Sequence, residues 1–402
     1  MNDYKILIFD KNPISNQESY KTLNINWGRT KNKNFSPIHS ISSYLAMFAP
    51  SLPDYFIKLY TNENATVMDN FSGRGTTALV ARECNRKFIG SDLNPYAYVL
   101  TNFKISKLNK QDILNLLDKM NNQFLNSNYM NFAIPDKYEE LKYFYSDDTL
   151  RQLIFLREEY GKKWYELGKN ENAIIAFALG LMHGKSKKDG SSIYFSIDMP
   201  NVISMAPNYV KNYVANHNLI KPKINIFENI KSRIENKFDD LLSKEYCGKC
   251  FLFDSTKTND AIMDSSVDLV ITSPPYLNIV DYKNSNWIKL WLLGYDRKST
   301  LKDIKLSDKL KYDEYVIFIK NYLNAIYPKL KKNAKVCLVV GDIKGEKLIE
   351  NVWEKLKNEI KYTFVNIYYD KNYKQNNKTT NMLNSKAGKA TKIEKVLIIE
   401  KI

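Results

Sequence analysis

The sequence predicts an α/β protein with a largely parallel, seven-stranded sheet that ends in a C-terminal hairpin, and with a mainly helical insertion. Three observations lead to this prediction. Short apolar strands alternate with helical periods at both ends of the 402-residue chain, which is typical of parallel α/β structure. The middle of the chain has helical periods without that alternation. The last two strands are separated by a polar stretch without a helical period, so they are expected to pair as a hairpin.

The N-terminal part, residues 1–105, contains one predicted βαβ unit. Apolar residues at 65–71 and 87–93 predict buried strands, and the pattern of 76–84 predicts a helix between them. Each strand ends in a polar, glycine-containing turn. This part is therefore expected to form one end of the sheet.

The middle part, residues 106–246, is expected to be a helical insertion. Its segments are rich in Lys, Asn and Tyr and follow a helical period. Within it, Ser196–Asn201 and Pro207–Val210 are expected to belong to a loop system that connects helices. Polar and basic residues of these loops could contact a polyanionic partner, and helix capping explains them equally well.

The C-terminal part, residues 247–402, returns to the strand pattern. The remaining five strands and two helices are predicted as follows: strands at 249–255, 267–275, 334–342, 362–370 and 395–402, and helices at 313–330 and 345–358.

Composition narrows the class of protein. There are 60 Lys and Arg against 44 Asp and Glu, a net charge of +16 that suits a polyanionic partner, although a solvated basic surface explains it as well. No apolar run approaches the roughly 20 residues needed to cross a bilayer, so no membrane association is expected. The four cysteines are too few and too scattered for a disulfide framework, so a reducing cytoplasm fits best.

A glycine-containing turn follows the first predicted strand. The segment DNFSGRGTT, from Asp69 to Thr77, lies where a strand ends and a helix begins, which is where ligands bind in open α/β sheets. The glycines let the backbone pass close beneath a ligand. Asp92, at the end of the second strand, could accept hydrogen bonds from both ribose hydroxyls of a nucleoside, although a helix N-cap is the alternative. No GxGxxG follows, so a nucleoside–methionine ligand fits better than a dinucleotide.

A second motif, Ser273-Pro274-Pro275-Tyr276, directly follows the apolar strand VDLVIT. Two consecutive prolines impose a rigid, extended turn. Such a turn can present the Ser273 hydroxyl and the Pro274 carbonyl to an amino group, while the Tyr276 ring offers a stacking face. Base stacking contributes roughly 1 to 3 kcal/mol and offsets much of the cost of extruding a base from duplex DNA.

Together the two motifs resemble those of the amino-group DNA methyltransferases, which transfer a methyl group from S-adenosylmethionine. The phrase from Asp69 to Asp92 follows that family's cofactor motifs, and DSSVDLVITSPPY, residues 264–276, is similar to its catalytic strand. Residues 35–50 resemble the motif that packs over the cofactor. The resemblance implies a Rossmann-like methyltransferase sheet, with the cofactor motifs in 1–105 and the catalytic motif in 247–402.

The resemblance also implies roles for individual residues. Asp69 orients the loop, Asp92 binds the ribose, and Asp254, at the end of the third strand, meets the adenine. Ser273, Pro274, Pro275 and Tyr276 hold a flipped base. The residues that complete the cofactor contacts are Phe71, Ser72, Gly73, Gly75, Thr76, Leu93 and Ser255.

The nature of the target base follows from Ser273. In this family serine at that position is associated with N4 of cytosine in double-stranded DNA, and Asn or Asp with N6 of adenine. Adenine N6 is the alternative target, followed by guanine N2 of RNA and by a catalytically silent nucleic-acid-binding scaffold. None of the four cysteines follows a proline, which excludes methylation at carbon 5 of cytosine. A cognate restriction endonuclease is a further expected partner.

Two further features remain. Cys247 and Cys250 have the spacing of half a zinc site, but the chain has only three histidines and no second pair at ligand spacing, so no metal is predicted. The resemblance implies target recognition by residues 106–246. In that family the insertion usually follows the third strand, whereas in this chain it precedes the third strand. The lysine-rich segments 296–312 and 371–392 are therefore alternative candidates for target recognition.

Overall fold

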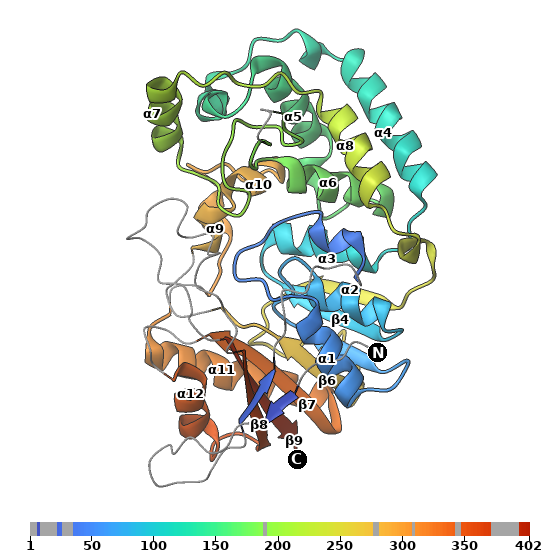
Figure 1. Ribbon diagram of the computed structural model, residues 1–402, viewed down its shortest axis with the longest axis vertical. Helices are drawn as coiled ribbons and strands as arrows, with labels where there is room; N and C mark the ends of the chain where they lie inside the picture. The colour runs from blue at the N-terminus through green and yellow to red at the C-terminus, as the bar shows by residue number, and fades with distance from the viewer. Residues whose placement is uncertain are drawn as a thin grey trace.

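The computed structural model describes residues 6–8, 22–25, 35–187, 191–275, 281–307, 310–341, 347–370 and 394–402. Two regions are stacked along the long axis of the molecule (Figure 1). One contains the sheet with the helices that cover it, and the other contains helices alone. The chain passes between the two regions more than once.

The sheet is mixed, and its strand order is β1-β2-β8-β9-β7-β6-β3-β4-β5. Strands β4, β3, β6 and β7 lie parallel to one another in its centre, and β5 continues this arrangement at one edge. The strands that match the sequence prediction are β3 (Thr66–Asp69), β4 (Lys87–Asp92), β5 (Gly248–Leu252), β6 (Val267–Thr272), β7 (Leu330–Gly341), β8 (Tyr362–Asp370) and β9 (Glu394–Lys401).

The predicted C-terminal hairpin forms, since β8 and β9 pair antiparallel from Tyr362 with Lys401 to Asp370 with Glu394. The α/β class is confirmed, but the count of seven strands was too low. Strands β1 (Ile6–Ile8) and β2 (Thr22–Ile25) extend the sheet beyond β8. They have three and four residues, too few to show an alternating pattern, and they form because the edge of β8 offers them a partner.

Helices cover both faces of the sheet. Alternate strand residues point to opposite faces: Val67 packs with α1 (Ser51–Tyr60) and α2 (Thr76–Glu83), whereas the next residue, Met68, packs with α11 (Tyr312–Ile326) and α12 (Leu348–Leu356). Helix α3 (Pro95–Ile105) follows β4 and joins the core of the helical region. The carboxyl ends of the central strands stay open between these helices.

The helical region is built mainly from residues 110–243. Its helices are α4 (Lys110–Leu125), α5 (Asp147–Glu159), α6 (Lys169–Leu181), α7 (Pro207–His217) and α8 (Ile226–Lys237). Short 3₁₀ helices occur throughout the described chain at Pro37–Ser40 (η1), Asn128–Met130 (η2), Asp136–Tyr143 (η3), Gly161–Lys163 (η4), Asp240–Ser243 (η5), Leu301–Asp303 (η6) and Tyr327–Lys329 (η7).

The chain enters the helical region again after β6. Helices α9 (Tyr282–Ser285) and α10 (Trp287–Leu292) pack into the same apolar cluster as α3, α5 and α6, so the insertion shares its core with its neighbours. Trp291 and Leu292 are buried. Residues 207–210 begin helix α7 rather than ending a loop, because Pro207 occupies the first helical turn, where its missing N–H is not needed.

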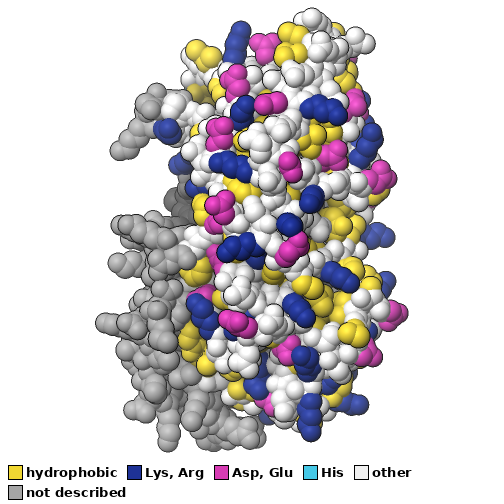
Figure 2. Space-filling view, turned by 90° about the vertical axis from the view of Figure 1, so that its right-hand side faces the viewer, with side chains coloured by type: hydrophobic (Ala, Val, Ile, Leu, Met, Phe, Trp, Pro, Cys, Tyr) yellow, Lys and Arg dark blue, Asp and Glu magenta, His cyan; other side chains and the backbone are white. Residues whose placement is uncertain are grey.

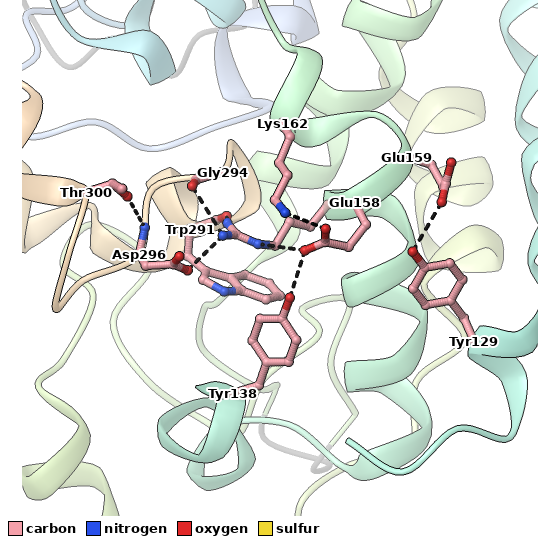
Figure 3. Close-up of polar contacts among 10 residues, drawn as sticks. Tyr129, Tyr138, Glu158, Glu159, Lys162, Trp291, Gly294, Asp296 and Thr300 are labelled. Carbon is pink, nitrogen blue, oxygen red and sulfur yellow. Dashed lines mark hydrogen bonds and ion pairs between the residues drawn. The ribbon is translucent and has the colours of Figure 1, made fainter. Parts of the chain in front are cut away.

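A buried arginine fastens α5 to the end of α10 (Figure 3). The Arg157 guanidinium donates to the carbonyls of Trp291 and Gly294 and to the Asp296 carboxylate, and it lies 5.1 Å from the centre of the Trp291 indole ring. These carbonyls are at the C-terminal end of α10, where a cation is favourable. The segment that follows the catalytic motif is therefore held by the insertion.

The face that carries α4 has charges of both signs. In Figure 2, Lys and Arg side chains are interspersed with Asp and Glu side chains, so the basic excess is not gathered there. Within the described ranges, none of the helices is long and apolar enough to cross a membrane.

Candidate active site

A cleft of about 850 Å³, partly open to solvent, lies at the carboxyl ends of β3, β4, β5 and β6. Strand β3 lies between β4 and β6, and this is where the chain changes the direction in which it adds strands. Ligands in open α/β sheets bind at such a position. Its walls come from the turns after these strands, from residues 44–48 before α1, from Tyr282, from Leu306 and Ser307, and from Phe318 of α11.

The turn after β3 is shaped by Asp69 and by two glycines. Asp69 Oδ1 accepts from the Thr272 hydroxyl at 2.6 Å and from the Phe71 N–H at 3.2 Å, so it joins the end of β3 to the end of β6, one residue before Ser273. Gly75 has a φ of +72°, and a Cβ there would lie 3.0 Å from the Thr101 hydroxyl. The turn therefore requires glycine at this position.

The second turn is organised by Asp92. Its Oδ2 accepts from the Gly73 N–H at 2.9 Å, and its Oδ1 accepts from the Asn94 N–H, also at 2.9 Å. The carboxylate therefore lies between the two turns and lines the cleft. The Asn94 side chain caps α3 through the Tyr96 N–H, so Asn94 serves as the N-cap, and Asp92 lines the cleft instead of capping the helix.

Burial raises the pKa of both carboxyl groups. The pKa of Asp69 rises to about 6, with the Thr272 and Thr77 hydroxyls and the Phe71 N–H offsetting part of the effect. Burial likewise raises the pKa of Asp92 to about 6, against hydrogen bonds from the backbone of Asn94 and Gly73. The two charges also oppose each other. Two buried carboxylates with little neutralisation favour a ligand that carries positive charge.

The outer wall comes from the segment before α1. The Tyr44 ring stacks on Tyr96 with 5.4 Å between centroids and on Tyr282 at 6.0 Å, and its hydroxyl accepts from the Asn94 side chain at 3.0 Å. Residues 44–48 line the cleft. This agrees with the expectation that residues 35–50 pack over the ligand.

Most of the predicted site residues meet in this one cleft. Asp69, Gly75 and Pro274 do not line it: Asp69 lies beneath the turn, and Gly75 starts α2. Tyr276 lies outside the described residues. Those that line the cleft are Phe71, Ser72, Gly73, Thr76, Asp92, Leu93, Asp254, Ser255, Ser273 and Pro275.

Several wall residues were not singled out from the sequence. Arg74 and Asn94 lie inside the recognised motifs and could have been found there. Tyr44 belongs to the segment predicted to cover the ligand, but Phe318 comes from α11, more than 200 residues after the first motif, and only the fold brings it to the cleft. The Phe71 ring packs against Phe318 at 5.7 Å and against Tyr322 at 5.1 Å.

The Asp254 side chain accepts from the N–H of Thr256 at 3.0 Å and from its hydroxyl at 2.7 Å. These bonds fix the turn after β5 at the rim of the cleft, next to Phe253 and Ser255. In the described part of the chain, no three His, Cys, Asp or Glu side chains come together in a way that could hold a metal ion.

The open α/β sheet, the cleft at its switch point and the pair of acidic turns define the class of S-adenosylmethionine-dependent methyltransferases. The sequence profile of the N6/N4 DNA methylase family matches residues 4–103 and 267–401. The chain belongs to this family, and its cofactor is S-adenosylmethionine.

Individual relatives are distant. The type II methyltransferase M.MjaII of Methanocaldococcus jannaschii is 23% identical over 79% of this chain and 74% of its own length. The type II methyltransferase M.BsoBI of Geobacillus stearothermophilus is 23% identical over 77% of this chain, and the match spans 64% of that relative, slightly under two thirds. Among solved structures, TrmN from Thermus thermophilus superposes over 91% of this chain and 52% of TrmN, with 9% identity and a TM-score of 0.35.

Proposed function

We propose that this chain methylates N4 of cytosine in double-stranded DNA, with Ser273 and Pro274 holding the target amino group. The observation that carries the proposal is the Asp69–Thr272 hydrogen bond of 2.6 Å, which fixes the end of β6 against the cofactor turn directly before Ser273. The turn that carries Ser273 and the turn after β3 are therefore held by the same hydrogen bond. Transfer of a methyl group to a weak nucleophile depends above all on such positioning.

The charges of the cleft fit the cofactor. S-adenosylmethionine carries a sulfonium and an ammonium group and, when bound, supplies the methyl group. The buried carboxylates of Asp69 and Asp92 favour these positive charges, and Asp92 is placed to accept from the ribose hydroxyls. Arg74, which lines the cleft and whose guanidinium donates to the His39 carbonyl and to the Thr76 hydroxyl, both at 3.0 Å, is the proposed partner of the methionine carboxylate. Phe253 and Asp254 would flank the adenine.

The residues of the catalytic turn act on the base. An exocyclic amino group delocalises its lone pair into the ring, so it is a poor nucleophile until its N–H groups are held out of the plane. The Ser273 hydroxyl and the Pro274 carbonyl would accept those N–H groups. The Tyr276 ring would stack on the extruded base. Serine at position 273 supports cytosine, by the resemblance stated above.

The direct experiment identifies the methylated nucleoside. The purified protein is incubated with labelled S-adenosylmethionine and mixed-sequence duplex DNA, and the DNA is digested and analysed by mass spectrometry. We expect N4-methylcytosine. N6-methyladenine would keep the enzyme class and overturn the base assignment, whereas cofactor binding without any methylated DNA would overturn the proposed substrate.

Two variants test whether Ser273 acts on the target amino group and not on cofactor binding. Ser273→Ala should lower the turnover number by about 100-fold while the affinity for S-adenosylmethionine stays unchanged, because the hydroxyl acts on the amino group. Ser232→Ala, an exposed serine of α8, is the matched control and should change neither quantity. Loss of cofactor affinity in Ser273→Ala would contradict the assigned role.

A cognate restriction endonuclease is the proposed biological partner and would cut the same sequence that this chain protects.

A further inference from the structure

We infer that helix α7 reads the bases of the DNA substrate. This inference rests on the proposed function, since it takes DNA as the substrate. It assigns target recognition to one face of one helix within residues 106–246. The argument depends on the exposure of α7, on its side chains, on the charge around it and on its connection to the cleft.

Helix α7 is attached lightly to the rest of the molecule. Pro207 and Val210 are its only buried side chains, and its principal neighbour is η3. It stands at the left edge of the helical region in Figure 1, on the same side of the molecule as α9. Most of its circumference is therefore open, as the major groove of DNA requires of a helix that enters it.

The open face carries two regular stripes. Asn208, Asn212 and Asn216 recur every fourth residue and are all exposed. Beside them, Tyr209, Tyr213 and His217 form a ladder of rings with 6.0 Å and 4.2 Å between successive centroids. Asn is a poor helix former, so helix stability does not explain its repetition. An Asn side chain makes two hydrogen bonds to the edge of adenine in the major groove, and this is a specific contact.

The charge around α7 favours a polyanion. From Met199 to Phe227 there is no Asp or Glu, and the stretch contains Lys211, Lys221 and Lys223. In η3, the neighbour of α7, Glu139 pairs with Lys142 at 3.1 Å. This contrasts with the α4 face of Figure 2, where acidic and basic side chains alternate. The helix itself and the segments on either side of it therefore carry no negative charge that would repel phosphates.

The segment directly before α7 is fixed to the segment that follows the Ser-Pro-Pro-Tyr motif. The Ser204 N–H donates to the Ser285 carbonyl at 2.7 Å, and the Trp287 indole N–H donates to the Met205 carbonyl at 2.9 Å. His183, which is buried, bonds the Ser204 hydroxyl through Nε2 at 3.0 Å. Ser204 and Met205, in the segment directly before α7, are thus tied to α9 and α10.

A buried lysine ties the same loop to the outer wall of the cleft. Lys289 Nζ donates to the Asn201 carbonyl at 3.2 Å and to the Ser43 carbonyl at 3.3 Å, one residue before Tyr44. Its Nζ also lies 5.0 Å from the centre of the Tyr96 ring. Helix α7 therefore keeps a fixed offset from the cleft, which is what a reading helix needs in order to select one base for extrusion.

The test replaces the asparagine stripe. The variant Asn208→Ala/Asn212→Ala/Asn216→Ala should keep its helix, since alanine is the best helix former. The matched control is Asn115→Ala/Asn122→Ala on α4, at the opposite edge of the molecule in Figure 1. Each protein methylates mixed-sequence plasmid DNA, the modified positions are mapped by sequencing, and the affinity for S-adenosylmethionine and the melting temperature are measured alongside.

We expect the wild type and the α4 control to methylate the same sequence motif at the same rate. The α7 variant should bind the cofactor normally and methylate that motif at least about tenfold more slowly, with weaker discrimination against related sequences. Unchanged motif and rate in the α7 variant would overturn the inference while leaving the proposed function intact. Absence of DNA methylation by the wild type would overturn the proposed function, and this inference with it.

A second variant tests the electrostatic part. Lys211→Gln should lower the salt dependence of binding to mixed-sequence duplex DNA, by about one in the slope of log affinity against log salt concentration. The corresponding control is Lys119→Gln on α4. Equal slopes for Lys211→Gln and the wild type would show that α7 does not contact phosphates, against the inference.

Discussion

Replacing Asp69 by Asn should stabilise the protein in the absence of cofactor. Asp69 is 1% exposed, and burial raises its pKa from 3.8 to about 6. Above pH 6 the native state therefore carries a buried charge that costs about 3 kcal/mol relative to the unfolded chain. Asn removes the charge. Its amide oxygen can still accept from the Thr272 hydroxyl and the Phe71 N–H, which both bond the same oxygen, Oδ1.

The pH dependence of the unfolding free energy tests the sign of this effect. The folded-state pKa of Asp69 lies above its unfolded value, so this group contributes stability that is present below about pH 4 and is lost as pH rises through about 6. The difference between Asp69→Asn and the wild type should thus be largest above pH 6 and vanish near pH 4. For a chain of this length, 3 kcal/mol corresponds to a rise of about 3 to 4 °C in the melting temperature.

Differential scanning calorimetry at pH 7.5 and pH 4.5 measures this effect. Asp260→Asn, which removes an exposed carboxylate, is the control and should leave the melting temperature unchanged at both values. We also expect Asp69→Asn to bind S-adenosylmethionine more weakly, because the negative charge that opposes folding favours the positive cofactor. A variant that melts at or below the wild-type temperature at pH 7.5 would refute the reasoning.

Three further predictions concern the cleft and its support. The affinity for S-adenosylmethionine should fall as pH drops through about 6, because protonation of Asp92 removes an acceptor for the ribose hydroxyls; titration calorimetry from pH 8 to pH 5 would reveal it, and a flat profile would contradict it. Gly75→Ala, at a φ of +72°, should cost about 1 to 2 kcal/mol of unfolding free energy and weaken cofactor binding, measured by denaturant titration and calorimetry. Arg157→Ala leaves the carbonyls of Trp291 and Gly294 without their donor and should lower the free energy of unfolding by about 3 kcal/mol or more. An unchanged denaturation midpoint would show that Arg157 does not hold α5 to the end of α10.

Much of the sheet and of the site is predictable from the sequence because the information is local. Seven strands were recognised from short apolar runs, and all seven form. Asp69 and Asp92 each follow a buried strand, and parallel neighbours end at the same edge, so their meeting follows from the strand order. The helical character of the insertion follows from its period, although the prediction of a loop at 207–210 missed the start of α7.

Other features depend on contacts between distant segments. Strands β1 and β2 are too short to show a pattern and exist through the edge of β8. Arg157 and Lys289 look like surface residues in the sequence, yet both are buried, because each finds backbone carbonyls more than 80 residues away along the chain. No pattern within one segment encodes such a partner.

The sequence by itself determined the family and the cofactor, and it located the two proposed motifs, because each combines a strand end with the residue types that its proposed chemistry requires. Only the tertiary structure decided that the insertion and the segment after β6 share one core, and that α7 stands out from it. It also decided that Ser204 ties the segment before α7 to α9, and that Lys289 ties that segment to the outer wall of the cleft. The physical reason is that a motif depends on neighbours in sequence, whereas the offset between α7 and the cleft depends on packing between segments that are remote in the chain.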